Sequence, residues 1–197
     1  MKITVITDAD YAENCYLVEH ENHAYIIDPG AAIEAVKSAV SNTPLPLKAI
    51  FLTHGHYDHT FSAGSLENIP IYAHVNEKML LEDASINLSA YTGSPVTLDS
   101  VIYFSADRHD IDGFEFIHTP GHTAGCVVIK IGDSLFSGDT LFYDTIGRTD
   151  LPTGDPKAMQ KSLKIFNGFD KGLMVYPGHG EPFLLGDAYK INYFLKR

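Results

Sequence analysis

The stretch LTHGHYDHT, residues 52–60, places three histidines and an aspartate within six positions, directly after the apolar run 47–52. His54, His56 and Asp58 alternate along the chain, and His59 follows at once. Imidazole nitrogens and carboxylate oxygens are the ligands that zinc takes in proteins, and iron and manganese also use them. The stretch therefore predicts part of a metal site in the loop after a strand.

Three later segments place similar side chains where a predicted strand ends. His122 follows the run 114–119 in a Pro-Gly turn, Asp139 ends the run 134–139, and His179 follows the run 172–176 in a second Pro-Gly turn. Loops at the ends of rigid strands are where binding sites are commonly built, because the scaffold fixes the ligands. The four strand ends are expected to form one site that contains no cysteine.

The predicted ligand set is too large for one tetrahedral ion. His54, His56, Asp58, His59, His122, Asp139 and His179 make seven candidates, so two divalent ions are expected. Asp139 is the natural bridge, because a carboxylate offers two oxygens. Two ions roughly 3.5–4 Å apart can share a water and lower its pKa, which supplies a nucleophilic hydroxide.

Composition and charge narrow the possible partners. Of the 197 residues, 45% are hydrophobic and 20% charged, as in a soluble globular protein. The formal net charge of −11 disfavours nucleic acid and anionic membrane surfaces, which attract basic proteins. The two cysteines, Cys15 and Cys126, are expected to be free thiols, and we expect one domain over residues 1–197 in the cytoplasm, with a small-molecule substrate.

Strand and helix patterns alternate along the chain and predict an α/β (α+β) protein with two mixed sheets and outer helices. The helix over 31–42 has apolar residues at helical spacing, and Asp155-Pro156 should begin another helix that Gly168 ends. Strands are expected at 3–7, 14–18, 23–28, 47–52, 69–74, 114–119 and 172–176, with a hairpin over 126–139, a short helix over 76–83 and a final helix over 187–197.

The motifs THGHYDH, TPGHTAG, FSGDTLF and YPGHG occur in the order found in the metallo-β-lactamase-fold hydrolases, and the chain resembles that superfamily over nearly its whole length. The resemblance implies a four-layer αββα sandwich with the metals at one edge. It also implies that His54, His56 and His122 bind one ion, that Asp58, His59 and His179 bind the other, and that Asp139 lies between them.

The stretch TIGRTDLPTGD, residues 145–155, resembles the corresponding segment of short bacterial glyoxalase II-type hydrolases and of persulfide dioxygenases, and its LPTGD continuation favours the hydrolases. The resemblance implies thioester hydrolysis, with two zinc ions expected and iron or manganese as alternatives. Asp58 would bind metal and orient the nucleophile. Arg148 either pairs with Asp150 or faces a substrate carboxylate, while Tyr143 and Tyr176 flank the ligands and either line the pocket or pack. The helical C-terminal domain that holds glutathione in longer relatives is not expected here.

Other functions fit part of the same pattern. His54, His122 and Asp139 would also make the two-histidine, one-carboxylate set of a mononuclear iron dioxygenase acting on persulfides. Lactone hydrolysis would use the full ligand set. A β-lactamase is less favoured, since enzymes with that activity usually replace part of the set. A non-catalytic metal-binding protein is the alternative outside enzyme classes.

Overall fold

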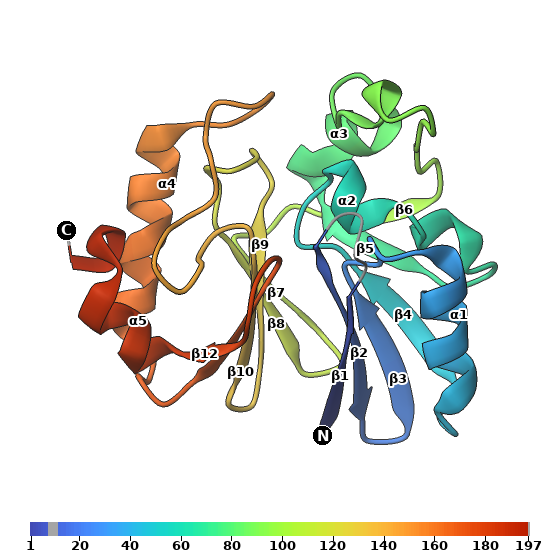
Figure 1. Cartoon of the computed structure of the whole chain (residues 1–197), viewed down its shortest axis with the longest axis horizontal. Helices are drawn as coiled ribbons and strands as arrows, with labels where there is room; N and C mark the ends of the chain where they lie inside the picture. Colours follow the sequence, from blue (N-terminus) through green and yellow to red (C-terminus); the bar gives the residue numbers. More distant parts are fainter. Residues whose placement is uncertain (8–11, 197) are drawn as a thin grey trace. The chain divides into compact units, whose positions relative to one another are not determined.

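The computed structural model describes residues 1–7 and 12–196, and the chain divides into two compact units (Figure 1). The N-terminal unit runs from Met1 to Phe104, and the C-terminal unit begins at Ser105. Each unit contains a six-stranded sheet with both parallel and antiparallel pairs. The two mixed sheets expected from the sequence are therefore present.

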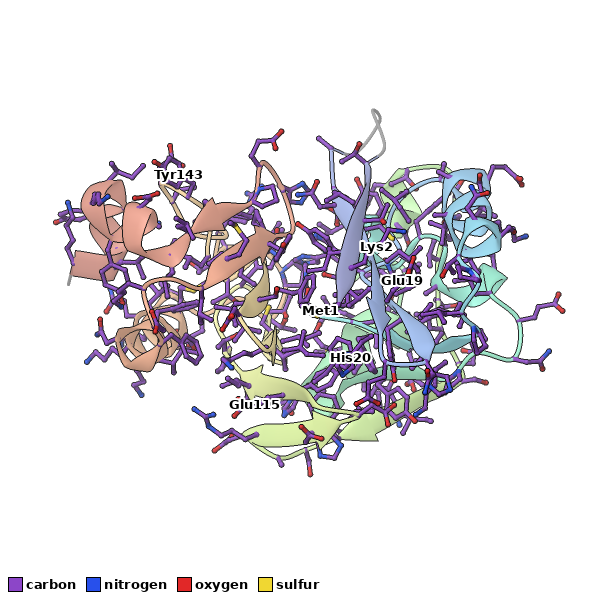
Figure 2. All side chains as sticks on the ribbon, turned by 90° about the horizontal axis from the view of Figure 1, so that it is seen from below. Met1, Lys2, Glu19, His20, Glu115 and Tyr143 are labelled. Atoms are coloured by element: carbon purple, nitrogen blue, oxygen red, sulfur yellow. The ribbon has the colours of Figure 1, made fainter. Side chains whose placement is uncertain are left out.

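The sheet of the N-terminal unit has its strands in sequence order, with an antiparallel half and a parallel half. The first three strands pair antiparallel, and the third to sixth pair parallel. Lys2 and Glu19 lie side by side on the first two strands, where the ammonium binds the carboxylate at 3.0 Å (Figure 2). The strands are β1 (Lys2–Thr7), β2 (Asn14–His20), β3 (His23–Ile27), β4 (Leu47–Phe51), β5 (Ile71–His74) and β6 (Val101–Phe104).

The parallel half explains why polar loops gather at one edge of this sheet. The carboxyl ends of parallel neighbours lie at the same edge, so the segments after β3, β4 and β5 are neighbours. The apolar run 47–52 predicted a strand buried on both faces, and Ala49 to Leu52 are all buried. Asp28 follows β3, the histidine loop follows β4, and Glu77 lies just beyond β5.

Helices of the N-terminal unit follow the strands of its parallel half. The helix α1 (Ile33–Asn42) packs Val36 into the core with Leu17 and Ile50. Short helices follow the later strands: α2 (Tyr57–Thr60), η1 (Ala63–Ser65), η2 (Val75–Glu77), α3 (Lys78–Glu82) and η3 (Ser89–Tyr91). Residues 75–100 thus form a long connection between β5 and β6, where the sequence predicted only one short helix.

The C-terminal unit has the strand order β12-β11-β10-β9-β8-β7, in which only β10 and β11 are parallel. Because β8, β10 and β11 run in the same direction, the turns after them lie at one edge. His122, Asp139 and His179 all follow these strands. The strands are β7 (Arg108–Ile111), β8 (Phe114–His118), β9 (Val127–Ile131), β10 (Ser134–Gly138), β11 (Met174–Pro177) and β12 (Phe183–Leu184).

The α-helix after Asp155 ends earlier than the predicted helix, which was expected to reach Gly168. The helix α4 (Pro156–Ser162) continues as the 3₁₀ helix η4 (Leu163–Gly168), and Met159, Leu163 and Phe166 are buried as expected. The final helix α5 (Leu185–Ile191) begins two residues before the predicted start and is followed by η5 (Tyr193–Lys196). Arg197, part of that predicted helix, lies outside the described residues.

The N-cap of α4 leads to a stability prediction. The carboxylate of Asp155 accepts hydrogen bonds from the backbone N–H groups of Lys157 and Ala158, and these bonds lower the pKa of Asp155 below 3.8. Asp155→Ala should lower the melting temperature by about 2–4 °C at pH 7.

The effect of Asp155→Ala on the melting temperature should be smaller at acidic pH. A carboxylate with a lowered pKa stabilises the fold above its ordinary pKa, and that contribution is lost as the pH falls through the folded value. The gap between Asp155→Ala and the wild type should therefore narrow below about pH 4 in thermal unfolding followed by circular dichroism. Asp144→Ala, at an exposed loop position, is the control, and an equal effect of both variants would refute the capping role.

Candidate metal centre

The histidine loop brings together the four ligands predicted in the N-terminal unit. His54, His56 and His59 are buried, with ring centroids 4.9 Å apart for His54 and His56 and 4.1 Å apart for His54 and His59. A carboxylate oxygen of Asp58 lies 3.9 Å from Nε2 of His59. The loop achieves this because His56 stands at the N-cap position of the short helix α2, and Asp58 and His59 follow within its single turn.

Asp28 contacts the candidate site, although the sequence interpretation did not include it. Its Oδ1 accepts the backbone N–H of Thr53 at 2.7 Å, and its Oδ2 accepts the Thr53 hydroxyl at 2.6 Å. The same Oδ2 lies 3.1 Å from Nδ1 of His59. Both oxygens of this buried carboxylate are therefore engaged at the base of the histidine loop.

These contacts decide which nitrogen two histidines present. A carboxylate only accepts, so Nδ1 of His59 carries the proton and donates to Asp28. The Thr53 hydroxyl gives its own proton to Asp28, so its oxygen accepts from Nδ1 of His54 at 3.1 Å. In both neutral imidazoles Nε2 then holds the lone pair, which is the usual arrangement for a metal ligand held by an outer carboxylate.

Potential ligand atoms of Asp28, His54 and His59 lie within 4.8 Å of one another. The hydrogen bonds of Asp28 favour an orienting role for this carboxylate, with the histidines as the ligands. The turn Asp28-Pro29-Gly30 is itself tightly constrained: Asp28 has φ of 50°, and a Cβ on Gly30 would lie 1.4 Å from the backbone oxygen of Asp58. Only glycine fits there, so the turn packs directly against the metal loop.

Both cysteines are free and buried, as predicted. Burial raises the pKa of the Cys15 thiol well above its ordinary value, and the nearby carboxylates of Glu13 and Asp28 raise it further. A thiol held neutral is a poor metal ligand, because the thiolate is the binding form. Cys126 instead accepts the backbone N–H of Thr123 at 3.3 Å, in the turn that carries His122. Neither thiol adds to the predicted ligand set.

The C-terminal unit brings its three predicted ligands around one carboxylate. Oδ2 of Asp139 lies 3.6 Å from Nε2 of His122 and 3.7 Å from Nε2 of His179. These separations exceed a hydrogen bond. Two ligands bound at about 2.0–2.1 Å to one tetrahedral ion lie roughly 3.3 Å apart, so the observed spacing suits metal coordination. Asp139 is thus placed between the two imidazoles.

The backbone after Asp139 fixes the orientation of His122. Nδ1 of His122 donates to the carbonyl oxygen of Arg148 at 2.7 Å, which leaves Nε2 to face Asp139. A Cβ on Gly147 would lie 2.0 Å from the Asp139 carbonyl oxygen and 3.0 Å from Nδ1 of His122. This glycine therefore allows the 145–155 segment to approach His122 closely enough for the hydrogen bond.

Arg148 and Asp150 form the ion pair that the sequence suggested. Nε and Nη2 of Arg148 bind the two carboxylate oxygens of Asp150 at 2.7 and 2.9 Å. The Arg148 hydrogen bond is the main cause that lowers the pKa of Asp150 to about 2. Both side chains are exposed, Arg148 by 62%, so the pair contributes little to stability but holds the guanidinium in a fixed orientation.

The two tyrosines proposed beside the ligands have different surroundings. Tyr143 is 44% exposed on the surface of its unit (Figure 2), with its ring 5.5 Å from that of Phe183. The ring of Tyr176 stacks on Phe136 at 5.2 Å in the sheet, which favours a packing role. Phe142, next to Tyr143, lies with its ring 6.2 Å from the ring of His179. Tyr143 is therefore the better placed of the two tyrosines to meet a ligand.

Comparison with known families agrees with this ligand chemistry. Residues 9–179 match the metallo-beta-lactamase superfamily. The chain belongs to that superfamily. The match covers both compact units, and the resemblance seen in the sequence motifs is confirmed.

The relatives share most of their length with this chain. The hydroxyacylglutathione hydrolase GloC of Haemophilus influenzae is 31% identical, over 99% of this chain and 98% of that protein. The crystal structure of TTHA1623 in a di-iron-bound form has a TM-score of 0.90 at 34% identity, covering 98% of this chain and 100% of that one. The structure of BLEG-1 B3 metallo-beta-lactamase also has a TM-score of 0.90, at 32% identity and complete coverage of both chains.

These similarities confirm the metallo-β-lactamase fold and place the chain among metal-dependent hydrolases. The relatives act on different substrates, as their names state, so the family alone does not choose between thioesters and β-lactams. In residues 1–7 and 12–196, no helix combines the length and apolar character needed to cross a membrane.

From the hydrogen bonds of Asp28 we predict that Asp28→Asn, which replaces one carboxylate oxygen by an amide nitrogen, lowers metal affinity. In Asp28→Asn, the amide oxygen can still accept the Thr53 N–H. The amide nitrogen, however, replaces the oxygen that accepts from the Thr53 hydroxyl and from Nδ1 of His59. We expect metal affinity to fall about 10- to 100-fold, as for other outer partners of ligating histidines. Chelator competition with Zn²⁺ measures this change. The exposed Asp99→Asn in the same unit is the control, and equal affinity of both variants would exclude the orienting role.

Proposed function

We propose that the protein is a binuclear metal-dependent thioesterase of the glyoxalase II type, acting on an S-acyl derivative of glutathione or a related small thiol. The observation that carries the proposal is the arrangement of imidazoles in each unit, with Nδ1 of His54, His59 and His122 held by an acceptor and Nε2 left for a metal. The hydroxyacylglutathione hydrolase relative supports the thioester as substrate.

In this proposal the ligands divide between two ions. His54, His56 and His122 bind one ion, and Asp58, His59 and His179 bind the other, with Asp139 between them. Zinc is the expected metal, and the di-iron form of TTHA1623 supports iron as an alternative, with manganese third. When bound, such ions supply a nucleophilic water near neutral pH and polarise a carbonyl oxygen.

The protein residues supply placement and proton handling. Asp139 turns one carboxylate oxygen toward both His122 and His179, which fixes the spacing of the ligands. The Asp58 side chain is 23% exposed, whereas His54, His56 and His59 are buried, and in this proposal it both binds metal and orients the attacking water. Asp28 keeps the Nδ1–H tautomer of His59, because its Oδ2 accepts the proton that this nitrogen donates.

Substrate recognition is proposed for Arg148 and Tyr143, with Tyr176 as a weaker candidate because its ring packs on Phe136. Asp150 binds Nε and Nη2 of Arg148, so Nη1 is the guanidinium nitrogen available to a substrate carboxylate. A fixed cation of this kind matters in a protein with a net charge of −11, which otherwise repels anionic substrates.

Metal content and substrate preference together test the proposal. Protein purified without added metal should contain two transition-metal ions per chain and should hydrolyse thioesters faster than lactones, β-lactams or persulfides. One iron per chain with oxygen uptake on a persulfide would instead support the mononuclear dioxygenase, which would use His54, His122 and Asp139. Two bound metals with no activity on any of these substrates would favour a non-catalytic metal-binding protein.

Loss of a ligand from either unit should abolish thioester hydrolysis. His56→Ala and Asp139→Ala should each lower metal content and reduce kcat/KM by at least about 10³-fold, because the activated water is lost. Circular dichroism should show an intact fold in both. His109→Ala, a histidine on β7 outside the ligand set, is the control. Full activity in either ligand variant would contradict the assignment.

Arg148→Ala separates recognition from bracing. If Arg148 binds a substrate carboxylate, KM should rise roughly 10- to 100-fold with a much smaller change in kcat, the range for a hydrogen bond to a charged group. Asp150→Ala frees the guanidinium and is the matched comparison. If the pair only braces the loop, both variants should keep a wild-type KM, and that pattern would remove Arg148 from the substrate site.

A further inference from the structure

Glu77 is a buried acid that directly contacts the histidine loop. It is 0% exposed, and its Oε2 accepts the backbone N–H of Gly55 at 2.6 Å. Gly55 stands between His54 and His56, so the carboxylate binds the short peptide segment that joins two candidate ligands. A short hydrogen bond to an ionised or strongly polar acceptor is among the stronger ones in proteins.

The fold places Glu77 there through the end of β5. This strand pairs parallel with β4, so the turn after β5 lies beside the loop after β4. The turn η2 follows at once, and Nδ1 of His74 accepts the backbone N–H of Asn76 at its start. Glu77 ends that turn and immediately precedes α3. Its position therefore follows from the strand pairing, although 22 residues separate it from Gly55.

Gly55 is tightly enclosed on the side facing α3. A Cβ at this position would lie 2.8 Å from Cβ of Leu80 and 3.0 Å from Oε2 of Glu77. The absence of a side chain thus lets the peptide reach the carboxylate. An apolar residue in place of Glu77 could fill the same space but would bury the Gly55 N–H without an acceptor, which is unfavourable.

A second contact from the same connection holds the loop two residues further on. The backbone N–H of Tyr57 donates to the carbonyl oxygen of Asn87 at 3.2 Å. The Asn87 side chain is itself fixed by hydrogen bonds to the carbonyl oxygens of Leu80 and Val96, both at 2.9 Å. Glu77 and Asn87 therefore bind the backbone of the histidine loop at Gly55 and Tyr57, on either side of His56.

We propose that Glu77 is a positioning residue of the metal centre: its hydrogen bond to Gly55 sets the orientation of the backbone that aims His54 and His56 at the metal. The inference rests on the proposed metal site. Metal ligands must be held within about 0.5 Å of their working positions, and rotation about the Gly55 backbone would move both imidazoles. The role differs from that of Asp28, which contacts the side chains of Thr53 and His59.

Two near-isosteric variants isolate the hydrogen bond from side-chain volume. Glu77→Met keeps the length of the side chain but removes the acceptor, whereas Glu77→Gln keeps an oxygen that can accept the Gly55 N–H. We expect Glu77→Met to lower the affinity for Co²⁺ about 10- to 100-fold and to shift the Co²⁺ absorption spectrum, the usual cost of losing an outer contact. Glu77→Gln should restore most of the affinity and the wild-type spectrum.

Glu82→Gln is the matched control, at the end of the helix α3 that Glu77 precedes. Glu82 is half exposed, pairs with Lys78, and ends α3 one turn beyond Glu77. Its substitution should leave Co²⁺ affinity and spectrum unchanged. A purely structural role for Glu77 would lower the melting temperature of the metal-free protein in Glu77→Met without changing affinity or spectrum. If the wild-type protein binds two Co²⁺ ions and Glu77→Met behaves in this way, the inference is overturned and the proposed function stays intact.

The wild-type protein supplies a second measurement should Glu77→Met not fold. In metal-free protein the amide proton of Gly55 should be strongly shifted downfield in the NMR spectrum and protected from solvent exchange. An unshifted, rapidly exchanging Gly55 amide would refute the inference without any variant. Wild-type protein that binds no Co²⁺ at all would instead contradict the proposed function, so the two failures are distinguishable.

Discussion

The carboxylate of Asp28 is the interaction on which the N-terminal part of the site depends. Buried imidazoles need a partner for one nitrogen, and whichever nitrogen finds it determines what the other can do. Asp28 holds Nδ1 of His59 directly and Nδ1 of His54 through the Thr53 hydroxyl. In the C-terminal unit the carbonyl oxygen of Arg148 has the same effect on His122. Three histidines from distant parts of the sequence therefore share the Nδ1–H tautomer, which leaves Nε2 with the lone pair.

Strand direction explains how such distant residues meet. Within the N-terminal unit, parallel pairing of β3, β4 and β5 brings Asp28, the histidine loop and Glu77 to one edge. Within the C-terminal unit, β8, β10 and β11 share a direction and place His122, Asp139 and His179 together. The sheets thus supply the rigidity, and the loops need only carry suitable donors.

Residues with a strong chemical signature were predictable from sequence, whereas their supports were not. The close spacing of His54, His56 and His59 indicates a metal site, and the apolar run before them indicates a strand. Asp28 fell at the end of a predicted strand and Glu77 within a predicted short helix, and only tertiary pairing shows what the two carboxylates contact. A backbone acceptor such as the Arg148 carbonyl has no sequence signal at all. The edge strands β6, β7 and β12 were missed because each has four residues or fewer, and β7 is also largely polar.

The supports also bear on how one ligand pattern can serve several reactions. Hydrolysis and oxygen chemistry draw on the same histidines and aspartates, so the identity of the ligands cannot by itself decide between them. The orientations of His54, His59 and His122, and that of the Arg148 guanidinium, are set by residues outside the ligand set. Differences in chemistry between relatives that share this fold should therefore arise in those supporting residues and in the exposed loop around Arg148, where a change leaves the ligands themselves intact.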